Sequence, residues 1–268
     1  MLRVSIVAGL ALTAVPVAAQ LPAALASERA EYALWLRSAT TSPYRAIAQQ
    51  PVGPGLRIGA GADLPLAGVP QQWLRQDDRG VTLEIGTERR ALPPGRPARV
   101  GRFSIVVGGT PGRAIVTVFD STKPAGTPEY FEHHAAHAFV GPLVPPAAPR
   151  TQRMLAPDGV EVEAFEAGTV SVPMGGTTTR LRVMRMPDPV TGESELEIFF
   201  RDSTNASETY PAGRFVSLVP VGGGRYRLDF NRARNPFCAY SSAYACPAPW
   251  SGNVLPARVA AGEKYRAK

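Results

Sequence analysis

The stretch ELEIFF, residues 195–200, alternates acidic and apolar side chains. Successive side chains of a β-strand point to opposite faces of its sheet, so Leu196, Ile198 and Phe200 share one face and the two glutamates share the other. This period of two predicts a strand with one face in a core and the other in water.

Runs of the same kind extend on both sides of this stretch. The predicted strands cover 56–58, 80–85, 102–107 and 113–119 in a first series, and 160–165, 168–172, 180–184, 195–200, 214–219, 225–230 and 257–260 in a second. The 26 Gly and 27 Pro, against 8% aromatic residues, suit short strands joined by tight turns and argue against a helical bundle. The sequence therefore predicts a mainly β protein: an N-terminal helix, an antiparallel sandwich, and a second antiparallel domain that is a sheet or barrel.

The domain organisation follows from the same pattern. Residues 20–50 form a helical segment, 51–122 the sandwich and 123–268 the second β domain, with a linker at 120–128 and an extended crossing at 141–149. Ser27 is the expected helix cap, and the helix should end before Pro43. Its aromatic stripe, Tyr32 and Trp35 followed by Leu36, is expected to pack against the first β domain.

The first 19 residues have the pattern of a secretory signal peptide. Arg3 precedes an apolar run from Val4 to Val17, and small residues precede an expected cut after Ala19. A membrane anchor is the rival interpretation, but the run is shorter than the roughly 20 residues that span a bilayer, and Pro16 interrupts it. We expect an exported protein, periplasmic or secreted, with no transmembrane segment in the mature chain.

The net charge of +7 comes from arginines that are scattered through the chain. A scattered basic surface is typical of a solvated face, and an exported protein rarely meets nucleic acid. No nucleic-acid partner is therefore expected. A small anionic ligand or a component of the cell envelope fits the charge better.

All three histidines lie in one short cluster: His133, His134 and His137. On a helix, His133 and His137 would share a face and could bind zinc, with Glu132 nearby as a base. The glutamate does not sit between the two histidines as in zinc proteases. The alternative is a His-rich surface loop, so no metal site is assigned.

The chain has two cysteines, Cys238 and Cys246. In an oxidising compartment two cysteines are expected to form one disulfide, which would stabilise the fold by about 2–3 kcal/mol through loop closure. A metal-binding or redox-cycling thiol pair is the competing interpretation, and seven intervening residues do not match a known spacing for it.

Polar residues gather at the ends and turns of the second strand series. The candidate ligand-binding residues are Arg201, Asp202, Thr204, Thr209, Tyr210, Arg214, Asp229, Asn231, Asn235 and Asn253. Such a density of donors and carboxylates beside apolar strands is typical of a recognition or catalytic surface carried on loops. The same residue types also satisfy backbone groups in turns, and an Arg–Asp pair can pin two loops together.

Several motifs of this region occur in a fixed order. They are FFRDST at 199–204, ETYPAGR at 208–214, LDFNR at 228–232, NPFCAY at 235–240, CP at 246–247, Asn253, and AGEK at 261–264. Together they resemble the bacterial family catalogued as domain of unknown function 1684, closely over about the last seventy residues. The resemblance implies no established activity, cofactor or substrate.

The resemblance weakens in some places. The family usually has an aromatic residue at Ala233 and a proline at Phe237, and the histidine cluster replaces a proline-containing turn and an aromatic–arginine pair. Residues 58–66 and 98–103 match more loosely, and this part of the family is similar to a forkhead-associated sandwich.

Two hypotheses of function remain. In the first, the protein is a non-catalytic binding module whose loop arginines, Arg201, Arg214, Arg232 and Arg234, hold an anionic group. In the second, it is a hydrolase-like enzyme that uses Asp202 or Asp229 as base, assisted by Tyr210 or Thr204 beside Arg214. Both require an accessible hollow where these side chains converge.

Overall fold

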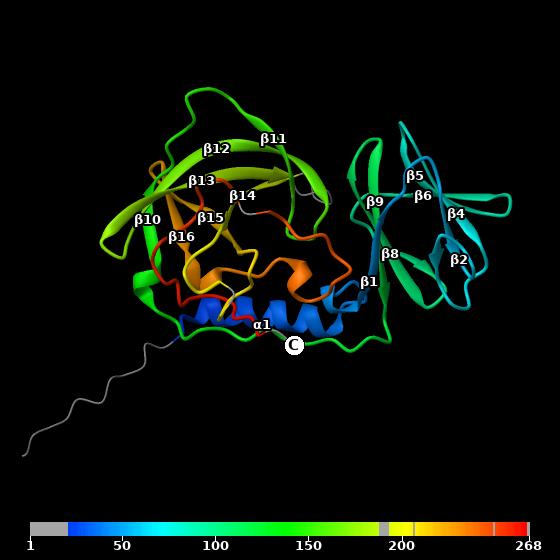
Figure 1. Ribbon diagram of the computed structural model, residues 1–268, viewed down its shortest axis with the longest axis horizontal. Coiled ribbons are helices and arrows are strands. Elements are labelled where there is room, and N and C mark those ends of the chain that lie inside the picture. Colours follow the sequence, from blue (N-terminus) through cyan, green and yellow to red (C-terminus); the bar gives the residue numbers. More distant parts are fainter. Residues whose placement is uncertain (1–20, 188–192, 206, 249, 267–268) are drawn as a thin grey trace, which may run out of the picture.

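The structure is a computed structural model that describes residues 21–187, 193–205, 207–248 and 250–266. The protein is mainly β, as predicted, with one sheet arching over an N-terminal helix and two smaller sheets beside it (Figure 1). The signal peptide predicted at residues 1–19 lies outside the described residues. Within these residues no helix has the length and apolar character needed to cross a bilayer.

The N-terminal helix, α1 (Ala23–Ser38), begins earlier than predicted. Pro22 occupies the N-cap position, and Ser27 lies inside the helix, where its hydroxyl donates to the Glu31 carboxylate. The helix ends before Pro43, as predicted, and a 3₁₀ turn, η1 (Pro43–Arg45), leads into the first strand.

The first β region is built of two sheets around one core. One sheet has the order β1-β9-β8-β7 and the other β3-β2-β4-β5-β6. The strands are β1 (Ala46–Pro51), β2 (Leu56–Gly59), β3 (Leu64–Pro65), β4 (Gln72–Asp77), β5 (Gly80–Ile85), β6 (Glu88–Leu92), β7 (Ala98–Val100), β8 (Phe103–Thr110) and β9 (Arg113–Asp120). Ile58 and Leu74 from one sheet share a fully buried core with Ile105 and Val118 from the other. We call this region the N-terminal sandwich.

The second β region is a single seven-stranded sheet with the order β10-β16-β15-β14-β13-β12-β11. Its strands are β10 (Ala138–Pro142), β11 (Thr151–Leu155), β12 (Glu161–Met174), β13 (Thr177–Pro187), β14 (Ser194–Phe200), β15 (Arg214–Gly222) and β16 (Arg225–Asp229). All neighbouring strands are antiparallel. The 3₁₀ turn η2 (Ala135–His137) precedes β10, and two more, η3 (Phe230–Arg232) and η4 (Phe237–Ala239), follow β16.

Both faces of the seven-stranded sheet are covered. Ile198 and Phe200 lie in one core, and Phe199 lies in another with Phe215 and Trp250. Glu197, on the face of Phe199, is also buried and accepts a hydrogen bond from Ser217. The prediction of a wet face was therefore wrong at Glu197, although Glu195 on the same face is exposed. Trp250, which follows β16, folds back onto this face.

Strand boundaries differ from the predictions at two places. The predicted strands 160–165 and 168–172 form one strand, β12, with a bulge between Glu166 and Gly168. At Gly168, a Cβ would lie 2.1 Å from the Val144 carbonyl oxygen, so only glycine fits this approach. Residues 257–260, predicted as a strand, are irregular. A side chain, Arg214, donates to the Val259 carbonyl in place of the hydrogen bonds of a neighbouring strand.

The helix α1 packs against the C-terminal part of the chain. Trp35 lies with its ring centroid 6.1 Å from that of Phe237, and the Tyr32 hydroxyl is 3.5 Å from that of Tyr240. Arg29 donates to the Asn231 carbonyl at 2.9 Å. The predicted packing of the aromatic stripe against the first β domain was wrong for Tyr32 and Trp35.

Candidate functional site

Asp202 and Arg214 form a fully buried ion pair at one end of the seven-stranded sheet. Asp202 follows β14 and Arg214 begins β15, and the guanidinium donates to the carboxylate at 2.8 Å with both side chains at 0% exposure. The other carboxylate oxygen accepts from the backbone N–H groups of Thr204 and Val259. A carboxylate with three donors is well satisfied without a ligand.

The Nη groups of Arg214 also hold the C-terminal segment of the chain. They reach the carbonyl oxygens of Val259, Ala261 and Glu263. The guanidinium also lies over the ring of Phe200, 5.2 Å from its centroid. Arg214 therefore pins residues 259–263 to the sheet and leaves no exposed face for an anion.

The other predicted residues are also engaged within the fold. The Thr204 and Thr209 hydroxyls bond to each other at 2.8 Å. Asn253 accepts from the Arg182 backbone N–H and donates to the carbonyls of Arg182 and Phe199, which pins its loop across β13 and β14.

A separate group lies near η3. The Asp229 carboxylate caps this turn by accepting from the backbone and side chain of Asn231. The Asn231 side chain also bonds to both backbone groups of His134. Asn235 donates its backbone N–H to Glu263 and its side chain to the Lys264 carbonyl.

The predicted site residues do not surround an accessible hollow. Buried side chains account for most of the set: Asp202, Thr204, Thr209, Arg214, Asn231, Asn235 and Asn253, with Arg201, Tyr210 and Asp229 half-buried. The prediction that they converge on an open hollow was wrong. The hydrolase hypothesis loses the opening that it required, and the structural alternative for this cluster fits the contacts.

Glu263 is the buried acid that sequence reasoning did not select. One carboxylate oxygen accepts from the Tyr240 hydroxyl at 2.5 Å and from the Asn235 backbone N–H at 2.8 Å, and the other has no partner among the described residues. Burial raises the pKa of Glu263 to about 7, although the hydrogen bond from Tyr240 opposes this. The only signal in the sequence was its place in the AGEK motif.

The histidine cluster does not adopt the helix that a zinc site needed. Residues 135–137 form one 3₁₀ turn, with His134 as its N-cap. His134 and His137 are 5.6 Å apart at their ring centroids. No group of three potential metal ligands occurs among the described residues.

Cys238 and Cys246 approach each other to 2.6 Å but are free cysteines, so the predicted disulfide is not present in the structure. Cys238 is buried and Cys246 is exposed. The Tyr210 hydroxyl lies 3.2 Å from the Cys246 sulfur. Burial, with contributions from Cys246, raises the pKa of Cys238 to about 12.

Comparison with known proteins identifies a family of unknown function. Residues 126–264 match the family described as "Protein of unknown function (DUF1684)". The chain belongs to this family. Among solved structures it is similar to an uncharacterised protein from Haloarcula marismortui determined by solution NMR, with 29% identity, 52% of this chain and 76% of that chain covered, and a TM-score of 0.44. No curated protein matched.

A hollow of about 470 Å³ lies within the DUF1684 region and is lined by residues of β11, β12 and β13 and by the two residues before β11. Its lining comprises Pro149, Arg150, Thr151, Gln152, Glu166, Arg182 and Met184. Arg182 donates through Nη2 to Gln152 at 3.3 Å and to Glu166 at 3.2 Å, and its side chain is 27% exposed. Nε and Nη1 of this guanidinium make no hydrogen bond to a described residue.

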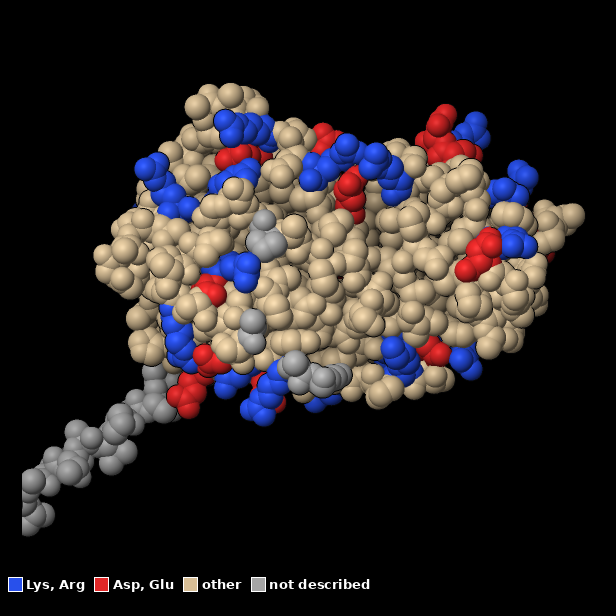
Figure 2. Space-filling model, in the orientation of Figure 1, with Lys and Arg blue, Asp and Glu red and all other residues tan. Residues whose placement is uncertain are grey.

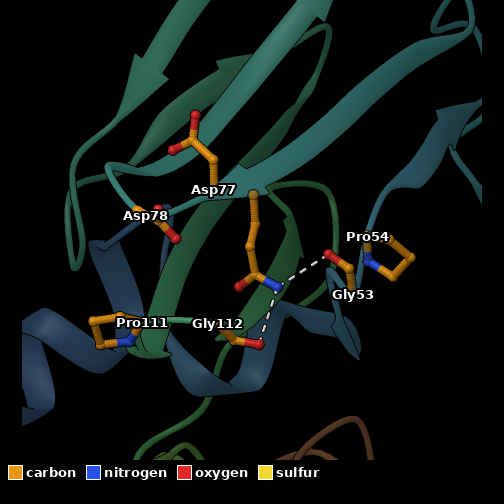
Figure 3. A pocket seen from close by; sticks show the side chains of 7 residues that line it. Gly53, Pro54, Asp77, Asp78, Pro111 and Gly112 are labelled. Carbon is orange, nitrogen blue, oxygen red and sulfur yellow. Dashed lines mark hydrogen bonds between the residues drawn. The ribbon is translucent and has the colours of Figure 1, made fainter.

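A second hollow, of about 460 Å³, lies outside the DUF1684 region, in the N-terminal sandwich (Figure 3). Gln76 bridges its walls by donating to the carbonyls of Gly53 and Gly112. Its charged lining residues are Asp77 and Asp78. Two carboxylates make this hollow unsuited to an anion.

Charged side chains are mixed across the surface. Figure 2 shows the lysines and arginines of one face interspersed with acidic side chains instead of gathered in one patch. An anion would therefore be selected by a local arrangement of donors, not by a broad basic field.

Proposed function

We propose that this member of the DUF1684 family is an exported, non-catalytic binding module that takes a small anionic ligand in the hollow between β11, β12 and β13. The observation that carries the proposal is the free part of the Arg182 guanidinium, which lines this hollow together with Arg150. An arginine fork offers paired donors to a carboxylate or phosphate.

Three of the four arginines predicted from the sequence are already paired within the fold, and the fourth, Arg201, has its Nε buried. Arg214 is sealed with Asp202. Arg232 and Arg234 both pair with Glu28 of α1. Arg150, in contrast, is exposed and makes no side-chain hydrogen bond or ion pair to the described part of the chain. The proposed anion site is therefore the hollow lined by Arg150 and Arg182 instead of the motif loops.

The hollow also offers neutral groups that could orient a ligand. Thr151 and Gln152 lie beside the two arginines, and Glu166 keeps one side of Arg182 occupied. The backbone of Arg182 is held on both its N–H and its C=O by Asn253. A fixed backbone reduces the ordering cost of binding.

Export is part of the proposal and is supported by the pattern of residues 1–19. In an oxidising compartment, Cys238 and Cys246 would then form a disulfide. Expression of the full chain in a bacterial host tests this: we expect the protein in the periplasmic or external fraction, with an intact mass that corresponds to a cut after Ala19. Retention of the uncut chain in the cytoplasm would contradict export.

The binding proposal is tested by calorimetric titration of the purified chain with phosphate, pyrophosphate and citrate. We expect Arg150→Gln and Arg182→Gln each to weaken binding about tenfold, because each removes a charged donor. Arg90→Gln is the matched control, since Arg90 is an exposed arginine on β6 of the N-terminal sandwich. Absence of binding by the unmodified chain, or equal losses in all three variants, would overturn the proposal.

A further inference from the structure

A small apolar core joins the N-terminal sandwich to the C-terminal part of the chain. It contains Ala46 of β1 and Phe119 of β9, packed with Cys238 and Tyr244. All four residues are buried. The loop 238–246, which we call the joint loop, therefore supplies the C-terminal side of this contact.

Hydrogen bonds tie the joint loop to β1. The Ser241 hydroxyl donates to the Ala46 carbonyl at 2.9 Å, and the Ala245 N–H donates to the Gln49 side chain at 3.2 Å. Gln49 in turn donates to the Asp158 carbonyl at 2.9 Å, just before β12. One β1 side chain thus connects the joint loop with the seven-stranded sheet.

The backbone beside this bridge is closely packed. A Cβ on Gly159 would lie 2.5 Å from the Ala245 carbonyl oxygen. The Phe237 N–H, next to Cys238, donates to the Pro157 carbonyl at 2.8 Å. The position of the joint loop therefore fixes the spacing between β1 and the start of β12.

The two cysteines stand at the two ends of the joint loop and approach each other to 2.6 Å. Cys246 is exposed and can meet an oxidant, whereas Cys238 is buried behind it. The Tyr210 hydroxyl at 3.2 Å is a polar neighbour of the Cys246 sulfur. This arrangement resembles an attacking thiol and a resolving thiol.

We infer that Cys238 and Cys246 are a dithiol–disulfide site whose oxidation state sets how firmly the joint loop holds the N-terminal sandwich against the seven-stranded sheet. The inference rests on the disulfide included in the proposed function. It adds a role for that bond, which is to hold the joint loop more firmly between the N-terminal sandwich and the seven-stranded sheet.

The oxidant is a low-mass disulfide or a disulfide-exchanging protein. The Cys246 thiolate attacks one sulfur of that disulfide, and the other sulfur leaves as a thiol after taking a proton. The Cys238 sulfur, on losing its proton, then attacks Cys246 and releases the second thiol. One disulfide is consumed, two thiols are released, and the protein loses two hydrogens.

The experiment oxidises the purified full chain with oxidised glutathione and measures two quantities. Thiol titration of the denatured chain should fall from two thiols to none. Hydrogen exchange should then slow about tenfold in the joint loop and in residues 46–50 and 157–160, because the closed loop opens less often. Exchange in β5 and β6 should not change, since these strands lie away from the joint.

Cys246→Ser is the control variant, because the Cys246 side chain is exposed and its replacement should not disturb the core. It should show the exchange of the reduced chain whether or not oxidant is present. If thiol titration finds no loss, the proposed disulfide and this inference both fail. If the bond forms but exchange at the joint is unchanged, only the inference fails, and the disulfide stands as a local link.

Discussion

Two arginine–carboxylate pairs of the seven-stranded sheet differ in their exposure. Arg214 and Asp202 are 2.8 Å apart with both side chains at 0% exposure, whereas Arg182 and Glu166 are 3.2 Å apart with 27% and 8% exposure. The Nη groups of Arg214 all donate to groups within the chain, whereas the Arg182 guanidinium lines a hollow. The same residue types therefore serve as a structural lock in one place and as a candidate ligand site in another.

Breaking the sealed pair should have the largest effect. Arg214→Met keeps much of the side-chain volume but leaves the Asp202 carboxylate buried without its partner. We expect a loss of about 3–5 kcal/mol in the free energy of unfolding, because an uncompensated buried charge is strongly destabilising. Urea unfolding followed by circular dichroism measures it.

The control is Arg258→Gln, which breaks an ion pair with Glu208 whose side chains are 56% and 40% exposed. No measurable loss is expected there, because exposed pairs are screened by water. If both variants unfold at the same urea concentration as the unmodified chain, the Asp202–Arg214 pair is not a lock.

The sequence predicted the fold better than the site, for a physical reason. Alternation within a strand is local, so β5 was predicted with its bounds and β14 to within one residue. The covering of the second sheet face depends on where Trp250 folds back. No local period encodes that return of the chain.

The predicted site failed on burial instead of residue type. Asp202, Arg214 and Asn253 were selected because such residues build both active sites and turns, and composition does not distinguish the two. Arg150 and Arg182 lie outside the motifs, so the sequence carries no signal for them. Their exposure beside a hollow is a property of the folded sheet.

Glu263 is an intermediate case, since it is sealed but only half paired. Burial raises its pKa to about 7, from 4.5 in the unfolded chain. The folded state therefore binds this proton more tightly, so the stabilising contribution of Glu263 is full below about pH 4.5 and is lost as the pH rises through about 7. The expected loss over this range is about 3 kcal/mol.

Glu263→Gln mimics the protonated acid and should remove this part of the pH dependence. The measurement is the difference in unfolding free energy between variant and unmodified chain at several pH values from 4 to 9. Glu197→Gln is the comparison, because the pKa of Glu197 is raised by burial to about 8. Its difference curve should continue to change up to that pH. A Glu263→Gln difference that is constant between pH 5 and 7 would contradict the assignment.

The smallest effect is expected at the half-exposed contact of α1. Glu28 pairs with Arg232 and Arg234, and its side chain is 30% exposed. Glu28→Gln should cost about 1 kcal/mol in unfolding free energy, and the loss should shrink in high salt because water and ions reach the pair. Glu31→Gln, on the exposed side of the same helix, should change less. A Glu28→Gln loss that is independent of salt and as large as that of Arg214→Met would place Glu28 with the sealed groups. The helix would then be held to the C-terminal segment by a sealed ion pair instead of a half-exposed one.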